Sequence, residues 1–142
     1  MTFQPGRILE VLAEFEVQFI LVGGMPAQVH GSQVPTTDVD ITPLMDVENL
    51  ERLARALQAL GAGIRVSGVP EGLPFNTDAR AIQGLGFLNL TTPYGDLDLT
   101  LMPAGTSGYP DLVQQAVVGH VGPIAVRVAS LDDIIRSKTA AG

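Results

Sequence analysis

The sequence contains no cysteine and only two histidines, His30 and His120. Without thiols the chain cannot form disulfides, thiolate zinc sites or cysteine nucleophiles, and two histidines are too few for a histidine-rich metal site. Oxygen atoms remain as possible ligands, and they suit hard cations such as Mg²⁺. Any metal ion bound by this chain must therefore be held by oxygen.

Basic residues and long apolar runs are also scarce. Lys and Arg number 8 against 15 Asp and Glu, which gives a formal net charge of −7. Such a chain is poorly suited to wrap a nucleic-acid backbone by itself, because that affinity comes mostly from Lys and Arg that displace counterions. No stretch approaches the roughly 18 consecutive apolar residues of a membrane-spanning helix, and the N-terminal residues do not resemble an export signal. We therefore expect a soluble, cytoplasmic protein with no membrane partner.

The 142 residues are 46% hydrophobic, which fits one domain over residues 1–142 with a single core. Apolar periodicity and capping signals predict helices at 7–16, 25–30, 47–60 and 131–142, with another starting near Pro110. Alternating and buried apolar runs predict strands at 19–22, 38–42, 64–66 and 124–129, and a hairpin of 86–92 and 96–101. The expected fold class is α/β (α+β), with a mixed β-sheet flanked by helices.

Several local features refine this expectation. Asp46 is the expected N-cap of helix 47–60, and Ser130 with Asp133 forms a capping-box variant before the last helix. Residues 67–78 are expected to form a flexible loop that could gate a site, and His120 is expected to lie in a turn.

Two aspartates interrupt the apolar pattern of the strand at 38–42. Asp38 and Asp40 are two residues apart, so on a strand they share one face, with their Cα atoms about 6–7 Å apart. Two ionised carboxylates on one face repel each other, and a divalent cation between them relieves that repulsion. The alternative for a lone Asp-x-Asp pair is a solvent-facing or edge strand whose charges discourage aggregation.

A second pair of aspartates, Asp96 and Asp98, shares one face of the last strand of the hairpin. If that strand lies beside strand 38–42, three carboxylates could meet. Gly23 and Gly24 follow strand 19–22 and open a short helix, where free backbone amides and the helix dipole stabilise phosphate oxygens. A glycine pair also ends strands for steric reasons alone, so this signal is weak by itself.

These segments resemble a known signature. The run "VGG" at 22–24, thirteen further residues, and "DVDI" at 38–41 resemble the hG[GS]…Dh[DE]h signature of the nucleotidyltransferase superfamily that includes DNA polymerase beta. More narrowly, "GGMPAQVHG", "TTDVDI", "PYGDLDLT" and "VASLDDIIRSKTAAG" are similar to small bacterial nucleotidyltransferase-like proteins related to the toxin components of abortive-infection toxin–antitoxin systems. Residues 61–84 carry little of this resemblance.

The resemblance implies a nucleotidyltransferase-type sheet and the transfer of a nucleoside monophosphate from an NTP to a hydroxyl group, with release of pyrophosphate and two Mg²⁺ (or Mn²⁺) ions. By the same resemblance, the catalytic and metal-binding residues are Asp38, Asp40 and a third acid, for which Asp98 fits better than Asp96. The residues implied to bind the nucleotide are Gly23, Gly24, Thr36 and Lys138.

Two departures from the family pattern are visible. Val34 stands where many relatives carry an arginine, four residues before the first acid, and the sequence ends at Gly142, before a basic segment that relatives usually contain. We therefore expect a domain that is shortened at its C-terminus. A catalytically degenerate nucleotidyltransferase-like module with a binding or regulatory role in a toxin–antitoxin type system is the alternative, although the intact acids count against it.

The resemblance does not identify the acceptor. A tRNA end, a protein hydroxyl and a small molecule all fit, because acceptor choice is set by loops and surfaces that share no short motif. An antitoxin-type protein is the possible macromolecular partner.

Overall fold

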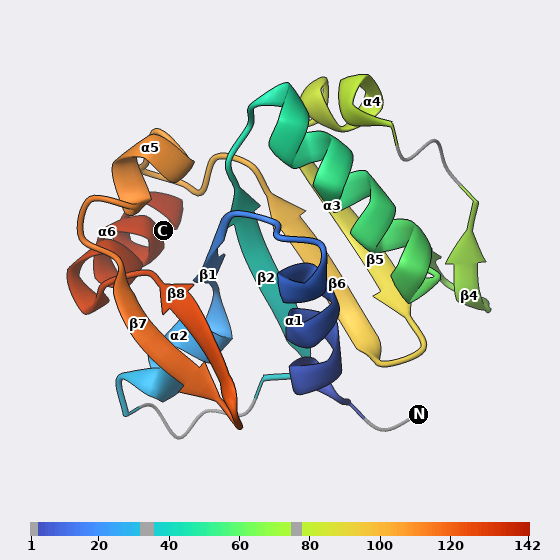
Figure 1. The fold of residues 1–142 in the computed structure, drawn as a ribbon. Coiled ribbons are helices and arrows are strands. Elements are labelled where there is room, and N and C mark those ends of the chain that lie inside the picture. The colour runs from blue at the N-terminus through green and yellow to red at the C-terminus, as the bar shows by residue number, and fades with distance from the viewer. Residues whose placement is uncertain (1–2, 32–35, 75–77) are drawn as a thin grey trace.

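The computed structural model describes residues 3–31, 36–74 and 78–142, and its centre is one eight-stranded sheet (Figure 1). The strand order is β4-β3-β5-β6-β2-β1-β8-β7. The strands are β1 (Phe19–Val22), β2 (Asp38–Pro43), β3 (Gly63–Val66), β4 (Val69–Leu73), β5 (Phe87–Thr92), β6 (Gly95–Thr100), β7 (Val117–Val121) and β8 (Ile124–Val128). The helices are α1 (Pro5–Glu14), α2 (Gly24–Val29), α3 (Val47–Leu60), α4 (Ala79–Gln83), α5 (Tyr109–Leu112) and α6 (Leu131–Ala141).

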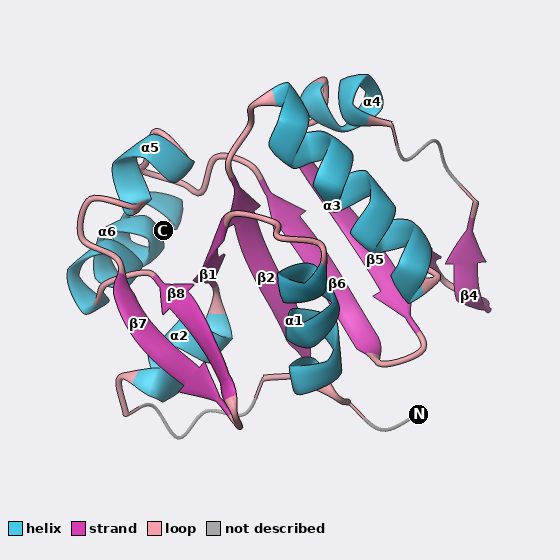
Figure 2. Cartoon of the chain, viewed as in Figure 1, coloured by secondary structure: helices cyan, strands magenta, loops and turns pink. Residues whose placement is uncertain are grey.

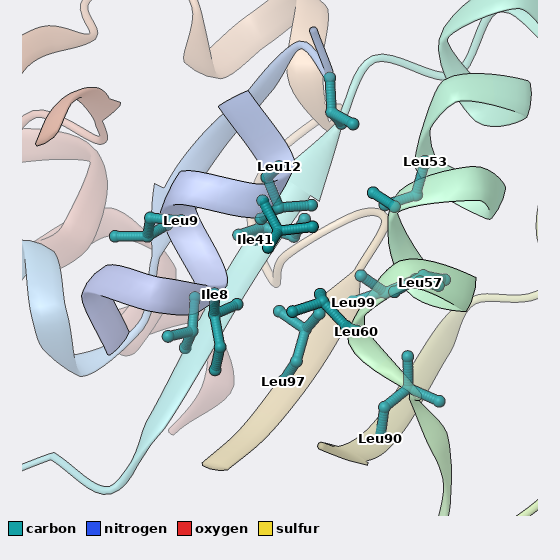
Figure 3. Close-up of a cluster of buried hydrophobic side chains, with 14 of the residues drawn as sticks. Ile8, Leu9, Leu12, Ile41, Leu53, Leu57, Leu60, Leu90, Leu97 and Leu99 are labelled. Atoms are coloured by element: carbon teal, nitrogen blue, oxygen red, sulfur yellow. The ribbon is translucent and has the colours of Figure 1, made fainter. Parts of the chain in front are cut away.

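Helices cover the two faces of the sheet unequally (Figure 2). On one face, α1 and α3 pack against the inward side chains of the central strands, and this packing forms the main core (Figure 3). The fully buried strand residues there include Val39, Ile41, Leu90, Leu97 and Leu99. On the other face, a smaller apolar cluster joins β1 to α5 and α6 through Ile20, Val22, Tyr109, Leu112 and Ile134. The mixed sheet flanked by helices is the fold class that the sequence predicted.

The central strands bring the predicted acidic segments together. β2 runs parallel to β6, and their register places Asp38 opposite Asp96 and Asp40 opposite Asp98. β1 runs antiparallel to β2, with Val22 opposite Asp40. The expected adjacency of the two aspartate strands is therefore confirmed.

Helix termini follow the capping signals. Asp46 accepts a hydrogen bond from the Asn49 backbone N–H at 2.7 Å, and Ser130 accepts one from the Asp133 N–H at 3.1 Å. Helix α3 ends at Gly61, which adopts the left-handed conformation with φ 66°. The predicted bounds of this helix agree with the structure.

The prediction of a loop over residues 67–78 is wrong for the first half of that range. Strand β4 lies there and pairs antiparallel with β3, whereas residues 75–77 lie outside the described residues. Gly63 and Gly72 cross so closely that a Cβ on Gly63 would lie 2.7 Å from the Glu71 carbonyl oxygen. His120, expected in a turn, belongs to β7. Across the described ranges, no helix combines the length and apolar character needed to cross a membrane.

Asn49 is a fully buried polar residue that ties the start of α3 to the sheet. Its Oδ1 accepts a hydrogen bond from the Gln18 backbone N–H at 2.7 Å. Its Nδ2 donates to the Gln18 and Leu44 carbonyls at 2.9 and 2.7 Å. A buried amide with these three partners ties the residue before β1 to the residue after β2, at the end of the strand pair where Phe19 lies opposite Pro43.

We expect Asn49→Ala to lower the free energy of unfolding by about 3 kcal/mol, because it removes buried hydrogen bonds and leaves backbone groups unpaired. Urea unfolding measures the loss. The matched control is Glu51→Ala, an exposed position on the same helix, which should change the stability by less than about 0.5 kcal/mol. Equal losses in the two variants would show that Asn49 has no special role.

Candidate functional site

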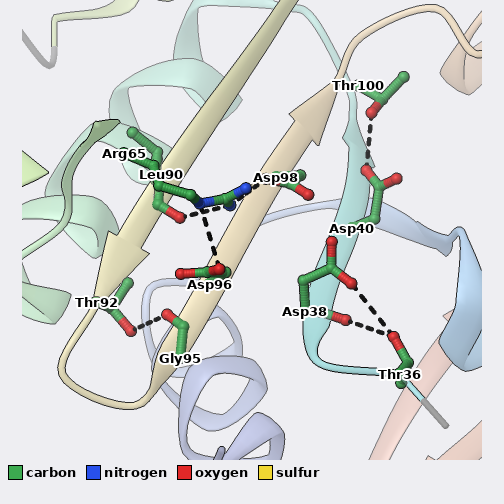
Figure 4. Close-up of polar contacts among 10 residues, drawn as sticks. All are labelled: Thr36, Asp38, Asp40, Arg65, Leu90, Thr92, Gly95, Asp96, Asp98 and Thr100. Carbon is green, nitrogen blue, oxygen red and sulfur yellow. Dashed lines mark hydrogen bonds and ion pairs between the residues drawn. The ribbon is translucent and has the colours of Figure 1, made fainter. Parts of the chain in front are cut away.

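Three carboxylates gather on the face of β2 and β6 that points away from the main core (Figure 4). Side chains alternate along each strand, so burial of Val39 and Ile41 on one face places Asp38 and Asp40 on the other. Asp98 reaches the same face from β6, where it lies opposite Asp40. The structure thus brings together the three acids that the sequence singled out.

The environment of these acids favours a bound positive charge. Burial raises the pKa of Asp40 to about 7, and repulsion from Asp98 and Asp38 adds to this rise, while a hydrogen bond from Thr100 opposes it. Burial also raises the pKa of Asp98 to about 6; the neighbouring Asp38 carboxyl group raises it further, and Arg65 opposes the rise. Carboxylates that resist ionisation in the free protein gain stability from a cation placed among them.

The structure separates the roles of Asp96 and Asp98. Arg65 contacts both side chains, but the Asp98 side chain is 15% exposed whereas the Asp96 side chain is 39% exposed. The Arg65 Nε lies 3.3 Å from the Asp96 Oδ2. Asp98 is therefore the more buried of the two acids, and its assignment as the third ligand stays a prediction.

Arg65 is the charged neighbour that sequence analysis missed. Its Nη2 donates to the Asp98 Oδ1 at 2.5 Å and to the Leu90 carbonyl at 2.9 Å, so the side chain reaches from β3 across β5 to β6 (Figure 4). A lone arginine on a four-residue strand gives no sequence signal. Only the strand order, which places β3 two positions from β6, puts it beside the acids.

A cavity of about 210 Å³ adjoins Asp40 at the end of β1. Gly23, Thr100 and Lys138 are among the residues that line it, so the cavity connects a predicted glycine and the predicted lysine to an acid. Gly23 has φ 77°, and a Cβ there would lie 3.0 Å from the Asp40 Cβ and 3.1 Å from its Oδ2. Glycine is required at this position by both its backbone conformation and its closeness to Asp40.

Gly24 and Thr36 lie next to each other beside Asp38. A Cβ on Gly24 would lie 3.1 Å from the Thr36 Oγ1. That hydroxyl donates to the Asp38 carbonyl and, at 3.3 Å, to the Asp38 Oδ1. Thr36 therefore positions the first acid, which is more than a turn-stabilising role. Val34, the departure from the family pattern, lies outside the described residues.

The site fits a hard divalent cation, because all three acids offer oxygen ligands. Asp40 and Asp98 are also partly shielded from solvent. Within residues 3–31, 36–74 and 78–142, however, no three acidic or histidine side chains already surround a common point. Two of the acids have hydrogen-bond donors instead: the Thr100 hydroxyl donates to the Asp40 Oδ1 at 2.8 Å, and Arg65 donates to the Asp98 Oδ1. Asp38, Asp40 and Asp98 could hold an ion once their side chains rotate toward a common point.

A comparison with solved structures identifies a counterpart of the fold. A crystal structure from Thermotoga maritima, which carries the provisional description of a nucleotidyltransferase, matches 99% of this chain and 88% of its own, with a TM-score of 0.61 and 14% sequence identity. At this identity the likeness shows a nucleotidyltransferase-like fold and does not by itself assign residues. A scan against protein-family models and a search of curated proteins give no match.

We expect Asp40→Asn to stabilise the cation-free protein at neutral pH. Because the folded-state pKa is raised to about 7, the native state binds more protons than the unfolded state between roughly pH 4 and 7, so stability falls as pH rises. Asp40→Asn has no ionisable group at this position and so avoids this loss of stability. Its free energy of unfolding at pH 8 should exceed that of wild type by on the order of 1–3 kcal/mol, given ~1.4 kcal/mol per pKa unit.

Urea unfolding in EDTA across pH 4–8 measures this advantage, which should vanish near pH 4 because Asp40 is then protonated in both states. Asp132→Asn, at an exposed position on α6, makes the same chemical change away from the acids and serves as the control. An Asp40→Asn variant that is less stable than wild type at pH 8 would contradict the electrostatic account.

Proposed function

We propose that the protein is a metal-dependent nucleotidyltransferase that moves a nucleoside monophosphate from an NTP to a hydroxyl group of an acceptor. The observation that carries this proposal is the parallel register of β2 and β6, which gathers Asp38, Asp40 and Asp98 on one open face. The nucleotidyltransferase-like fold supports it. In the reaction the acceptor oxygen bonds to the α-phosphorus, the bond to the bridging oxygen breaks, and pyrophosphate leaves with that electron pair.

In this proposal, Asp38, Asp40 and Asp98 hold Mg²⁺ or Mn²⁺. The bound ions would supply neutralisation of the phosphate charge and activation of the attacking hydroxyl. The chain contributes a rigid support, because all three acids stand on neighbouring strands of one sheet whose opposite face is fully buried. Thr36 and Thr100 hold Asp38 and Asp40 by hydrogen bonds.

The nucleotide-binding residues in this proposal are Gly23, Gly24, Thr36 and Lys138. Lys138 and Gly23 border the same cavity as Asp40, so a phosphate group there would meet a positive charge and an unobstructed backbone. Gly24 keeps the space between the start of α2 and Thr36 free of a side chain. This arrangement places the phosphate groups and the cations next to each other.

The acceptor stays undetermined among tRNA, protein and small molecules, and the net charge of −7 makes an RNA acceptor harder to hold without a partner. A degenerate nucleotide-binding or regulatory module, related to toxin–antitoxin systems and acting with an antitoxin-type partner, is the second candidate function. Two observations favour it. Arg65 is hydrogen-bonded to Asp98, and no ready-made cation site exists among the described residues.

We expect incubation with α-phosphate-labelled NTPs, Mn²⁺ and cell extract to label an acceptor. Asp40→Asn and Asp38→Asn should reduce the labelling rate by on the order of 100-fold or more, because each removes a charged ligand. Asp132→Asn should label at the wild-type rate. Equal labelling by wild type and Asp40→Asn would rule out the assigned acids, and absence of labelling in all variants would favour the binding module.

A separate prediction concerns the cation alone. Mn²⁺ at about 100 times its Kd should stabilise the wild-type protein by about 2–3 kcal/mol, because it binds the folded state only. Thermal unfolding, with each variant compared with its own EDTA baseline, should show this gain for wild type and Asp132→Asn. A similar gain in Asp40→Asn would mean that the cation binds elsewhere.

A further inference from the structure

Arg65 places a fixed positive charge beside the third acid. Its guanidinium contacts three acceptors: the Asp98 Oδ1 at 2.5 Å, the Leu90 carbonyl at 2.9 Å and the Asp96 Oδ2 at 3.3 Å. The Arg65 side chain is 34% exposed, so its charge is partly shielded from water. Such a charge-assisted contact is stronger than a fully exposed ion pair.

Two of the three Arg65 contacts do not involve Asp98. If the Arg65–Asp98 contact breaks, we therefore expect Asp98 to move and Arg65 to stay. The Leu90 carbonyl belongs to the β5 backbone, whose pairing with β6 fixes its position. Asp96 supplies a second negative partner. Arg65 can therefore remain in place when Asp98 rotates away, because its hydrogen bond to the Leu90 carbonyl and its ion pair with Asp96 remain.

Asp98 itself stands between two alternatives. Arg65 lies on one side of Asp98, and Asp38 and Asp40 on the neighbouring strand β2 lie on the other (Figure 4). Asp38 and Asp98 both repel the carboxylate of Asp40. A cation placed among the three acids relieves this repulsion and draws Asp98 toward Asp38 and Asp40.

We propose that Arg65 and a divalent cation compete for Asp98, so that Arg65 lowers the cation affinity of the site. Arg65 is then a positioning residue, and Asp96 acts through it by keeping the guanidinium in place when Asp98 leaves. The inference rests on the proposed function for the location of the cation. It adds that the site binds cations weakly without nucleotide, because binding must break the Arg65–Asp98 ion pair.

The test is a double-mutant cycle with Mn²⁺ binding as its readout, measured by electron paramagnetic resonance of free Mn²⁺ without nucleotide. Arg65→Met should tighten binding by about tenfold, which is the effect of removing one competing charge-assisted hydrogen bond. Asp96→Asn should weaken binding by about threefold, because Arg65 then relies more on Asp98. In the Arg65→Met background, Asp96→Asn should change binding by less than about twofold.

Controls separate charge competition from a general effect. Arg55→Met makes the same chemical change on α3, which covers the opposite face of the sheet, and should leave the affinity unchanged. Arg65→Lys keeps the charge and should restore most of the wild-type affinity. If Arg65→Met does not give a cooperative thermal transition, Arg65→Gln replaces it with a neutral side chain that can still bond to the Leu90 carbonyl.

The outcomes are distinct. Unchanged or weaker Mn²⁺ binding in both neutral Arg65 variants overturns the proposal, as does an equal effect of Asp96→Asn in both backgrounds, which would make Asp96 a direct ligand. Tighter binding in Arg65→Met, including binding that wild type lacks, supports it. Since no turnover is measured, a protein that labels no acceptor can still confirm the Arg65 effect, and an active enzyme can still refute it.

Discussion

The register between β2 and β6 is the constraint on which the site depends. Val39, Ile41, Leu97 and Leu99 are fully buried under α1 and α3, so neither strand can slip by one residue without moving apolar side chains into water. The same alternation holds all the aspartates of the two strands on the opposite face. The apolar core therefore positions the acids, although it does not touch them.

This dependence explains what could be predicted from sequence. Helices such as 47–60, the paired acids and the hairpin at 86–101 are encoded locally, by periodicity, capping residues and alternation, and the structure confirms them. The strand expected at 64–66 is β3, whereas β4 and β7 are short and have glycine or proline within or beside them, so no local pattern marks these two strands. Arg65 could not be assigned at all, because its place beside Asp98 follows from the order of strands far apart in sequence.

Charge at the site opposes stability. Asp38, Asp40, Asp96 and Asp98 share one face, and Arg65 is the positive side chain that contacts two of them. Burial raises the pKa values of Asp40 and Asp98 well above the ordinary range of a carboxyl group. A chain selected for stability alone would replace such residues, so their retention on a well-packed sheet is typical of a functional site.

Asp40 links the two halves of this site. Its Cβ and carboxylate lie so close to Gly23 that any side chain at that glycine would collide with them, and its carboxylate borders the cavity that Lys138 lines. On its other side it is repelled by Asp38 and Asp98. A ligand that brings phosphate to the glycine and the lysine, together with a cation to the acids, would satisfy both sides of Asp40 at once. An NTP bound with its divalent cation has this composition, whereas a phosphate group alone would add negative charge beside carboxylates that already repel one another.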